Sequence, residues 1–247
     1  MLRRISTNTD LKRLKNNPPE PGRPYEPTDV EHIANIITHG AWVLPSAGAL
    51  IFMVYLATSD LHLAVAVIYG LALIALFSVS TAFHVVSYTG WLKDWKFFFH
   101  MGDRAIIYIF IASSYTPWLL LKEFHNWAEE VLYIVWFLAV SGIIYQYVFH
   151  ERYKKLEIIL YLITGICPAV VILDVKDSAG LYELALGGIT YVLGVVFFKC
   201  DGVIPFAHAI WHCFVFVGAL FHFYAICVHL LGAFEEHSPL YSYTQSS

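Results

Sequence analysis

Seven long apolar stretches, separated by short polar segments, constrain this chain more than any other feature of its sequence. They cover residues 33–57, 62–86, 98–121, 131–149, 156–174, 181–198 and 206–231. Each is close to the ~20 residues that an α-helix needs to cross the hydrocarbon core of a bilayer. Apolar residues make up 58% of the chain and charged residues only 14%, which excludes a soluble domain. The sequence therefore predicts an all-α integral membrane protein, a bundle of seven transmembrane helices.

The chain divides into three parts by composition. Residues 1–30 form a basic N-terminal arm with six Lys or Arg and no apolar core, so we do not expect them to be a cleavable signal peptide. Residues 31–231 form the predicted seven-helix domain, and residues 232–247 form a short tail. The charges of the arm either bind anionic lipid headgroups or serve only to orient the chain. Pro45, Pro117 and Pro168 are predicted to kink or end the spans that contain them.

The Lys and Arg residues outside the spans concentrate in alternate connecting segments. Twelve of them lie in the arm and in the second, fourth and sixth loops, whereas the opposite side holds only Lys122 and Lys176. Positively charged loops stay on the cytoplasmic side of a membrane. We therefore expect a cytoplasmic N-terminus and an extracellular or lumenal C-terminus.

Polar residues inside the apolar spans gather at the cytoplasmic ends of three predicted helices. The end of the second helix has Ser80 and His84, the start of the third has His100, Asp103 and Arg104, and the start of the seventh has His208 and His212. Ionisable groups within a membrane are costly to bury and usually functional. These three helix ends are therefore expected to meet at one site.

The spacing of these residues predicts a metal site. His208 and His212 are four residues apart, so they lie on one face of a helix and can bind one ion. A third nitrogen from His84 would leave an open coordination position, as in a catalytic zinc site. Asp103 could then hold or deprotonate a water, and Ser80, one turn before His84, could hydrogen-bond the water, a substrate carbonyl or Asp103.

Each of these residues also has a structural interpretation that the sequence leaves open. The two histidines of the seventh helix could pack helices together through hydrogen bonds. Asp103 could form an ion pair with Arg104, and Ser80 could be a small packing residue. In the first helix, Glu31, Asn35 and His39 follow at four-residue steps, so His39 either bonds a neighbouring helix or supports the metal ligands. His100 is a possible supporting donor or an alternative ligand.

The same residues resemble a known family of membrane proteins. The pattern SxxxH at 80–84, Asp103 in the next helix and HxxxH at 208–212 is similar to the progestin and adipoQ receptor family, the hemolysin III-like proteins. The resemblance covers nearly the whole chain. The stretches HMGDRAIIYIFIASSYTPWL and GVVFFKCDGVIPFAHAIWH are most similar to its monocyte-to-macrophage differentiation branch.

The resemblance implies more than the spacing does. It implies a zinc ion held by three histidines just inside the cytoplasmic surface. Some family members are regarded as receptors with an intrinsic hydrolase activity toward ceramide-like lipid amides. Others, including this branch, are described as receptors or organisers of signalling on Golgi and endolysosomal membranes, which implies an endomembrane location, in the Golgi or in late endosomes and lysosomes, rather than the plasma membrane.

Two functions therefore remain open at the level of sequence. The first is a zinc-containing receptor-type signalling protein with a membrane lipid as ligand and a cytoplasmic signalling partner. The second is an intramembrane zinc-dependent lipid-amide hydrolase, with Asp103 as general base and Ser80 assisting the oxyanion. A transporter is a weaker third possibility, because the chain shows no convincing internal repeat. Nothing predicts nucleic-acid binding, and the oligomeric state is left open.

Overall fold

A computed structural model describes residues 14, 16–18, 26–149, 152–172 and 174–233 of the 247-residue chain. The described residues form helices joined by connecting segments, and they include no named strand. The helices are α1 (Asp29–Gly40), α2 (Val43–Leu56), α3 (Asp60–Thr89), α4 (Lys96–Leu121), α5 (Ala128–Val148), α6 (Lys154–Ile166), α7 (Ala169–Ile172), α8 (Leu181–Phe198) and α9 (Ala207–His229), with a short 3-10 turn at Lys93–Trp95.

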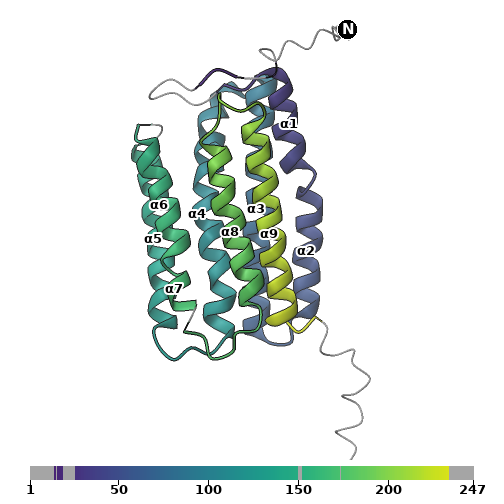
Figure 1. Cartoon of the computed structure of the whole chain (residues 1–247). Helices are drawn as coiled ribbons and strands as arrows, with labels where there is room; N and C mark the ends of the chain where they lie inside the picture. The colour runs from purple at the N-terminus through teal and green to yellow at the C-terminus, as the bar shows by residue number, and fades with distance from the viewer. Residues whose placement is uncertain (1–13, 15, 19–25, 150–151, 173, 234–247) are drawn as a thin grey trace, which may run out of the picture.

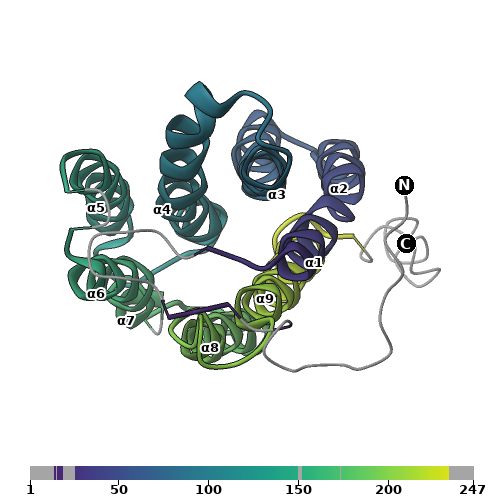
Figure 2. The ribbon, with the colours of Figure 1, turned by 90° about the horizontal axis from the view of Figure 1, so that it is seen from above.

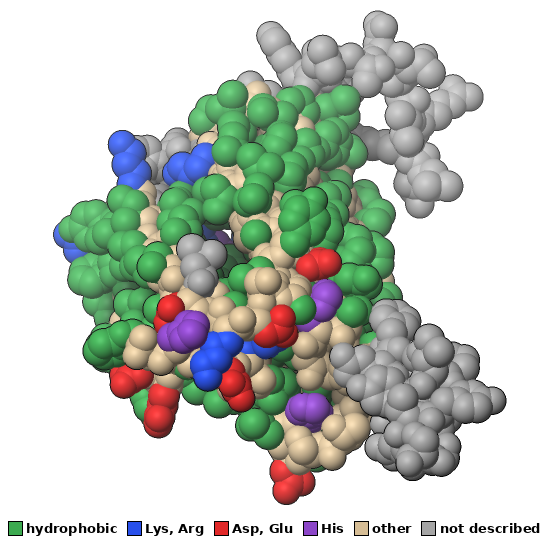
Figure 3. Space-filling view, turned by 60° about the horizontal axis from the view of Figure 1, so that its bottom comes forward, with side chains coloured by type: hydrophobic (Ala, Val, Ile, Leu, Met, Phe, Trp, Pro, Cys, Tyr) green, Lys and Arg blue, Asp and Glu red, His purple; other side chains and the backbone are tan. Residues whose placement is uncertain are grey.

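Seven segments of the described chain are long and apolar enough to cross a membrane (Figure 1). The pair α1 and α2 makes the first segment, α6 and α7 make the fifth, and α3, α4, α5, α8 and α9 make the others. The outer faces of these helices carry exposed Leu, Ile, Val, Phe and Tyr side chains, and charged groups gather at the end of the bundle shown in Figure 3. The predicted all-α seven-span membrane fold is confirmed.

Two of the predicted spans are interrupted, and proline explains both breaks. The first span begins at Asp29 rather than 33 because Thr28 caps α1, in a reciprocal capping box with Glu31. It then breaks between Gly40 and Val43, since Pro45 has no N–H with which to continue the helix. Pro168 separates α6 from α7 in the same way. Pro117, by contrast, lies inside α4, about one turn before its end.

The helices form a ring when seen along the bundle axis (Figure 2). Neighbours in sequence are neighbours in space, and α9 closes the ring by packing against both α8 and α1. The α5 helix lies outside α4, and α6 continues the ring between α5 and α8. A buried apolar core that includes Tyr69 and Trp118 joins α3, α4 and α9.

The candidate polar residues lie at the ends of α3, α4 and α9, and the fold brings these three helix ends to the same end of the bundle. The start of α1, the end of α3 and the starts of α4, α6 and α9 all lie at the upper end in Figure 1. The loops rich in Lys and Arg are at this same end. Its cytoplasmic orientation stays a prediction, and residues 1–13 and 234–247, which hold most of the arm and the tail, lie outside the described residues.

Candidate metal centre and adjoining cavity

Three histidines from two helices converge at the upper end of the bundle. His84 comes from the last turns of α3, and His208 and His212 come from the first turns of α9. Each residue has one ring nitrogen that can serve as a ligand atom, and these three nitrogens all lie within 4.8 Å of one another. All three side chains are buried. The structure therefore brings together the three residues that the sequence analysis proposed as metal ligands.

The start of α9 is held in place by α1. Phe206 caps α9 with a left-handed backbone (φ 59°), and its N–H donates to Glu31 Oε1 at 3.1 Å. The same glutamate closes the capping box at the start of α1. One buried carboxylate thus ties the first turns of two helices together, and this fixes the height at which His208 and His212 enter the bundle.

Hydrogen bonds orient the two imidazoles of α9. Thr38 Oγ1 donates its one proton to the Ala34 carbonyl at 2.8 Å. The same oxygen lies 3.0 Å from His212 Nδ1, so in that contact it accepts the ring N–H. His208 Nδ1 lies 3.3 Å from Asp201 Oδ2, a carboxylate that can only accept. In a neutral ring, each contact leaves the lone pair on Nε2. This is how histidine ligands to a metal are commonly supported.

His84 lacks such support on either side of its ring. It is fully buried, and neither ring nitrogen has a hydrogen-bond partner. A buried polar group without a partner costs free energy, so a bound group facing His84 would compensate for its burial. Three imidazole nitrogens that converge in this way are a donor set that suits zinc. His84, His208 and His212 therefore fit the metal that the resemblance implied.

Ser80 and Asp103 lie beside this cluster. Ser80 is one turn before His84 on α3, and its buried hydroxyl lies close to the Asp103 carboxylate on α4. Both residues line the same cavity as His208 and His212. A proton acceptor and a hydroxyl donor therefore lie next to the proposed metal position.

The two predicted supporting histidines lie in different places. His39 is buried in α1, and its ring stacks on that of His212 with centroids 3.7 Å apart. His100 stacks on Phe83 and accepts a 3.3 Å hydrogen bond from Arg104 Nε, so it lies outside the group of three. His39 thus touches a proposed ligand directly, whereas His100 lies outside the three proposed ligands.

Sequence reasoning missed two carboxylates near the site. Arg104 Nη1 lies 2.6 Å and 2.8 Å from the oxygens of Glu157 on α6, so its ion-pair partner is Glu157 and not the neighbouring Asp103. The other is Asp201, which supports His208. An acidic residue inside the fifth apolar stretch was the available signal for Glu157. Asp201 precedes His208 by seven residues across a loop, so no helical spacing pointed to it.

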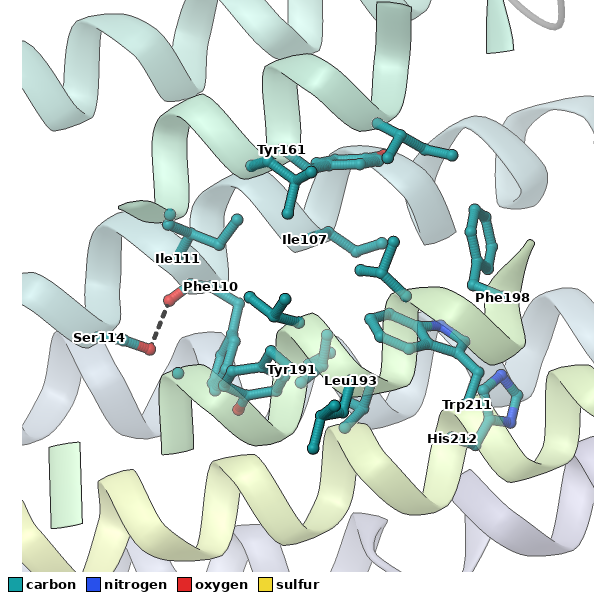
Figure 4. A pocket seen from close by; sticks show the side chains of 18 of the residues that line it. Ile107, Phe110, Ile111, Ser114, Tyr161, Tyr191, Leu193, Phe198, Trp211 and His212 are labelled. Carbon is teal, nitrogen blue, oxygen red and sulfur yellow. Dashed lines mark hydrogen bonds between the residues drawn. The ribbon is translucent and has the colours of Figure 1, made fainter. Parts of the chain in front are cut away.

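A large apolar cavity adjoins the three histidines. It has a volume of about 750 Å³ and lies between α4, α6, α8 and α9, with Pro18 of the arm at its edge. Figure 4 shows its wall, in which Ile107, Ile111 and Leu193 surround the space and His212 stands at one end. Its size and apolar lining suit an acyl chain.

A second, smaller cavity reaches the site from the surface. It has a volume of about 200 Å³, and His84 contributes to its wall. The other residues of the wall are mostly polar: Glu26, Pro27, His32, Phe83, Ser87, Lys96 and His100. The three histidines thus separate a polar opening from an apolar chamber within the membrane.

The fold and the site together define a class: a seven-helix membrane protein with a buried cluster of three histidines at one end and a lipid-sized cavity beside it. Comparison with known proteins specifies the family. Residues 30–223 match the family described as haemolysin-III related. The chain belongs to this haemolysin-III-related family, and the resemblance drawn from its motifs is confirmed.

Individual relatives come from animals and bacteria. The human protein named monocyte to macrophage differentiation factor is 45% identical over 218 residues, which cover 88% of this chain and 91% of that protein. A hemolysin-3 homolog of Bacillus subtilis is 35% identical over 79% of this chain and 92% of its own length. Hemolysin-3 of Bacillus cereus is 33% identical, over 81% and 92% respectively.

Proposed function

We propose that this chain is a zinc-containing, receptor-type membrane protein that holds a membrane lipid beside its metal site and signals to a cytoplasmic partner. One observation carries the proposal: the apolar cavity ends at the cluster formed by His84, His208 and His212. A lipid headgroup at the histidines would leave its acyl chain in the cavity. An endomembrane location, in the Golgi or in late endosomes and lysosomes, belongs to the same proposal.

Different residues of the chain would bind the metal and the lipid. Thr38 and Asp201 contact Nδ1 of the two α9 imidazoles and leave Nε2 available to the metal, and His84 supplies the third nitrogen. The apolar cavity wall excludes water from the acyl chain. Because the ligands come from α3 and α9, occupation of the site couples the positions of these helices at the end where a cytoplasmic partner would bind.

Filling the cavity tests the lipid half of this proposal. Gly188 lines the cavity, and nothing lies within 4 Å of a side chain built there, so Gly188→Leu fits the helix but occupies the space. In nanodiscs, zinc-loaded protein should bind octadecanoate, and Gly188→Leu should weaken this binding at least about tenfold. Gly48→Leu is the matched control, because Gly48 is equally open but does not line the cavity. Equal binding by all three proteins would refute the lipid assignment.

A second function is favoured by the position of Asp103 and Ser80, which lie at the histidine end of the cavity. In this alternative, a water adds to the carbonyl carbon of a ceramide-like lipid amide, and the C–N bond breaks. Asp103 takes a proton from the water and passes it to the amine nitrogen, while Ser80 donates to the oxyanion. Bound zinc would supply Lewis-acid chemistry to the carbonyl.

Fatty-acid release separates the two functions. Purified zinc-loaded protein given ceramide in nanodiscs should release no fatty acid if it is only a receptor. If it is a hydrolase, release should be measurable and should fall at least about a hundredfold in Asp103→Asn, which keeps the shape of the side chain. Zinc content, measured on the same samples, should be equal in both proteins.

A further inference from the structure

A second polar cluster lies away from the three histidines, further along the same cavity. His222 on α9 and Tyr191 on α8 both line the cavity. His222 is only 7% exposed, and neither of its ring nitrogens has a hydrogen-bond partner. The Tyr191 hydroxyl is also buried and without a partner. Proteins rarely leave such groups unpaired.

Two glycines make room for this pair of side chains. A methyl group added at Gly187 would lie 2.6 Å from His222 Nε2, and one added at Gly218 would lie 2.7 Å from the Tyr191 ring. The two rings face each other across the α8–α9 contact with centroids 5.6 Å apart. The packing of these two helices therefore holds both polar groups in place at the cavity wall.

The position of the pair sets the distance between the two polar sites along the cavity. His208 and His222 lie on one face of α9, because fourteen residues complete almost four helical turns. His222 follows His212 by ten residues, which corresponds to about 15 Å along the helix, roughly the reach of a dozen methylene groups. Figure 4 shows Tyr191 and His212 well apart along the cavity, with Leu193 between them.

We propose that His222 and Tyr191 form a recognition site for an oxygen function in the middle of a lipid chain whose headgroup lies at the three histidines. A neutral imidazole offers one donor and one acceptor, and a phenol offers both. Together they match a hydroxyl group, which also donates and accepts. This inference rests on the proposed lipid-binding function and specifies its ligand as a chain-hydroxylated acyl lipid.

Two fatty acids that differ by one hydroxyl group test the site. Zinc-loaded protein in nanodiscs should bind 12-hydroxyoctadecanoate about tenfold more tightly than octadecanoate, because the bound hydroxyl pairs two buried groups. Tyr191→Phe and His222→Phe should each remove this preference while octadecanoate binding stays within about twofold of wild type. Tyr191→Phe removes a single atom, so it keeps the test valid if His222→Phe folds poorly.

Tyr115→Phe is the matched control. Tyr115 also lines the cavity, but its hydroxyl already donates to the Gly165 carbonyl, so its loss should leave the preference unchanged. Equal binding of the two fatty acids by wild type would show that the pair holds water only, and would overturn the inference while leaving the lipid cavity intact. A preference that survives in both variants would also overturn it. If neither fatty acid binds, the proposed function fails together with the inference.

Discussion

At the scale of single residues, spacing alone could not predict the side chains that orient the proposed ligands. HxxxH spacing identified His208 and His212 because residues four apart share a helix face. Thr38 and Asp201 contact these rings from α1 and from the loop before α9, so only the fold brings them there. His84 was inferred from its position at a helix end, and the structure brings it next to the other two.

Thr38→Val should weaken zinc binding without removing a ligand. The change takes away the oxygen that accepts from His212 Nδ1, and loss of such a supporting group typically costs about ten- to a hundredfold in metal affinity. Competition with a chelator would measure the effect. Thr190→Val is the control, since Thr190 makes the same hydrogen bond to the residue four before it but lies on α8, away from the histidines. Equal affinities would contradict the role given to Thr38.

At the scale of helices, the number and approximate limits of the spans could be predicted, but not how they pack. Hydrophobic length is a local property, and it identified all seven segments. The Arg104–Glu157 pair depends on α6 lying against α4, which no local pattern encodes. The placement of α5 outside α4 likewise follows from tertiary contacts such as the buried Tyr108 ring against Gly142.

Gly142→Ala should loosen the contact between α4 and α5. An added methyl group would lie 2.3 Å from the Tyr108 ring, so the helices must move apart, at a cost of about 1–3 kcal/mol. Thermal unfolding in detergent would report this as a lower midpoint. The same change at Gly48, where nothing lies within 4 Å, should be neutral or slightly stabilising. A midpoint for Gly142→Ala at or above that of wild type would contradict this packing.

Glu157→Gln should destabilise the attachment of α6. It leaves the Arg104 guanidinium without its buried carboxylate partner, and breaking a buried pair in this way costs about 3–5 kcal/mol. A double-mutant cycle would compare the unfolding of Arg104→Met, of Glu157→Met and of the variant that carries both changes. The double variant should be more stable than the sum of the single changes predicts. Strict additivity would mean that the pair does not couple the two helices.

At the scale of the whole molecule, the orientation in the membrane follows from charge rather than from contacts. The loops rich in Lys and Arg share one end of the bundle with the three histidines, while Lys122 and Lys176 lie at the other. An odd number of spans puts the two termini on opposite sides.

Epitope tags at the two termini would test this orientation. The N-terminal tag should be detected after selective permeabilisation of the plasma membrane. If the protein lies at the cell surface, the C-terminal tag should be detected on intact cells. If it lies in an internal membrane, the tag should be detected only after full permeabilisation. The reverse pattern would place the histidines on the extracellular or lumenal side and would remove the proposed contact with a cytoplasmic partner.

The metal content of purified protein tests the central claim most directly. Wild type should contain one zinc per chain, and His84→Ala and His212→Ala should contain almost none, because each loses one of three ligands. His100→Ala, which removes a buried imidazole outside the cluster, should keep the metal. Wild type without zinc, or full zinc in both ligand variants, would contradict the account.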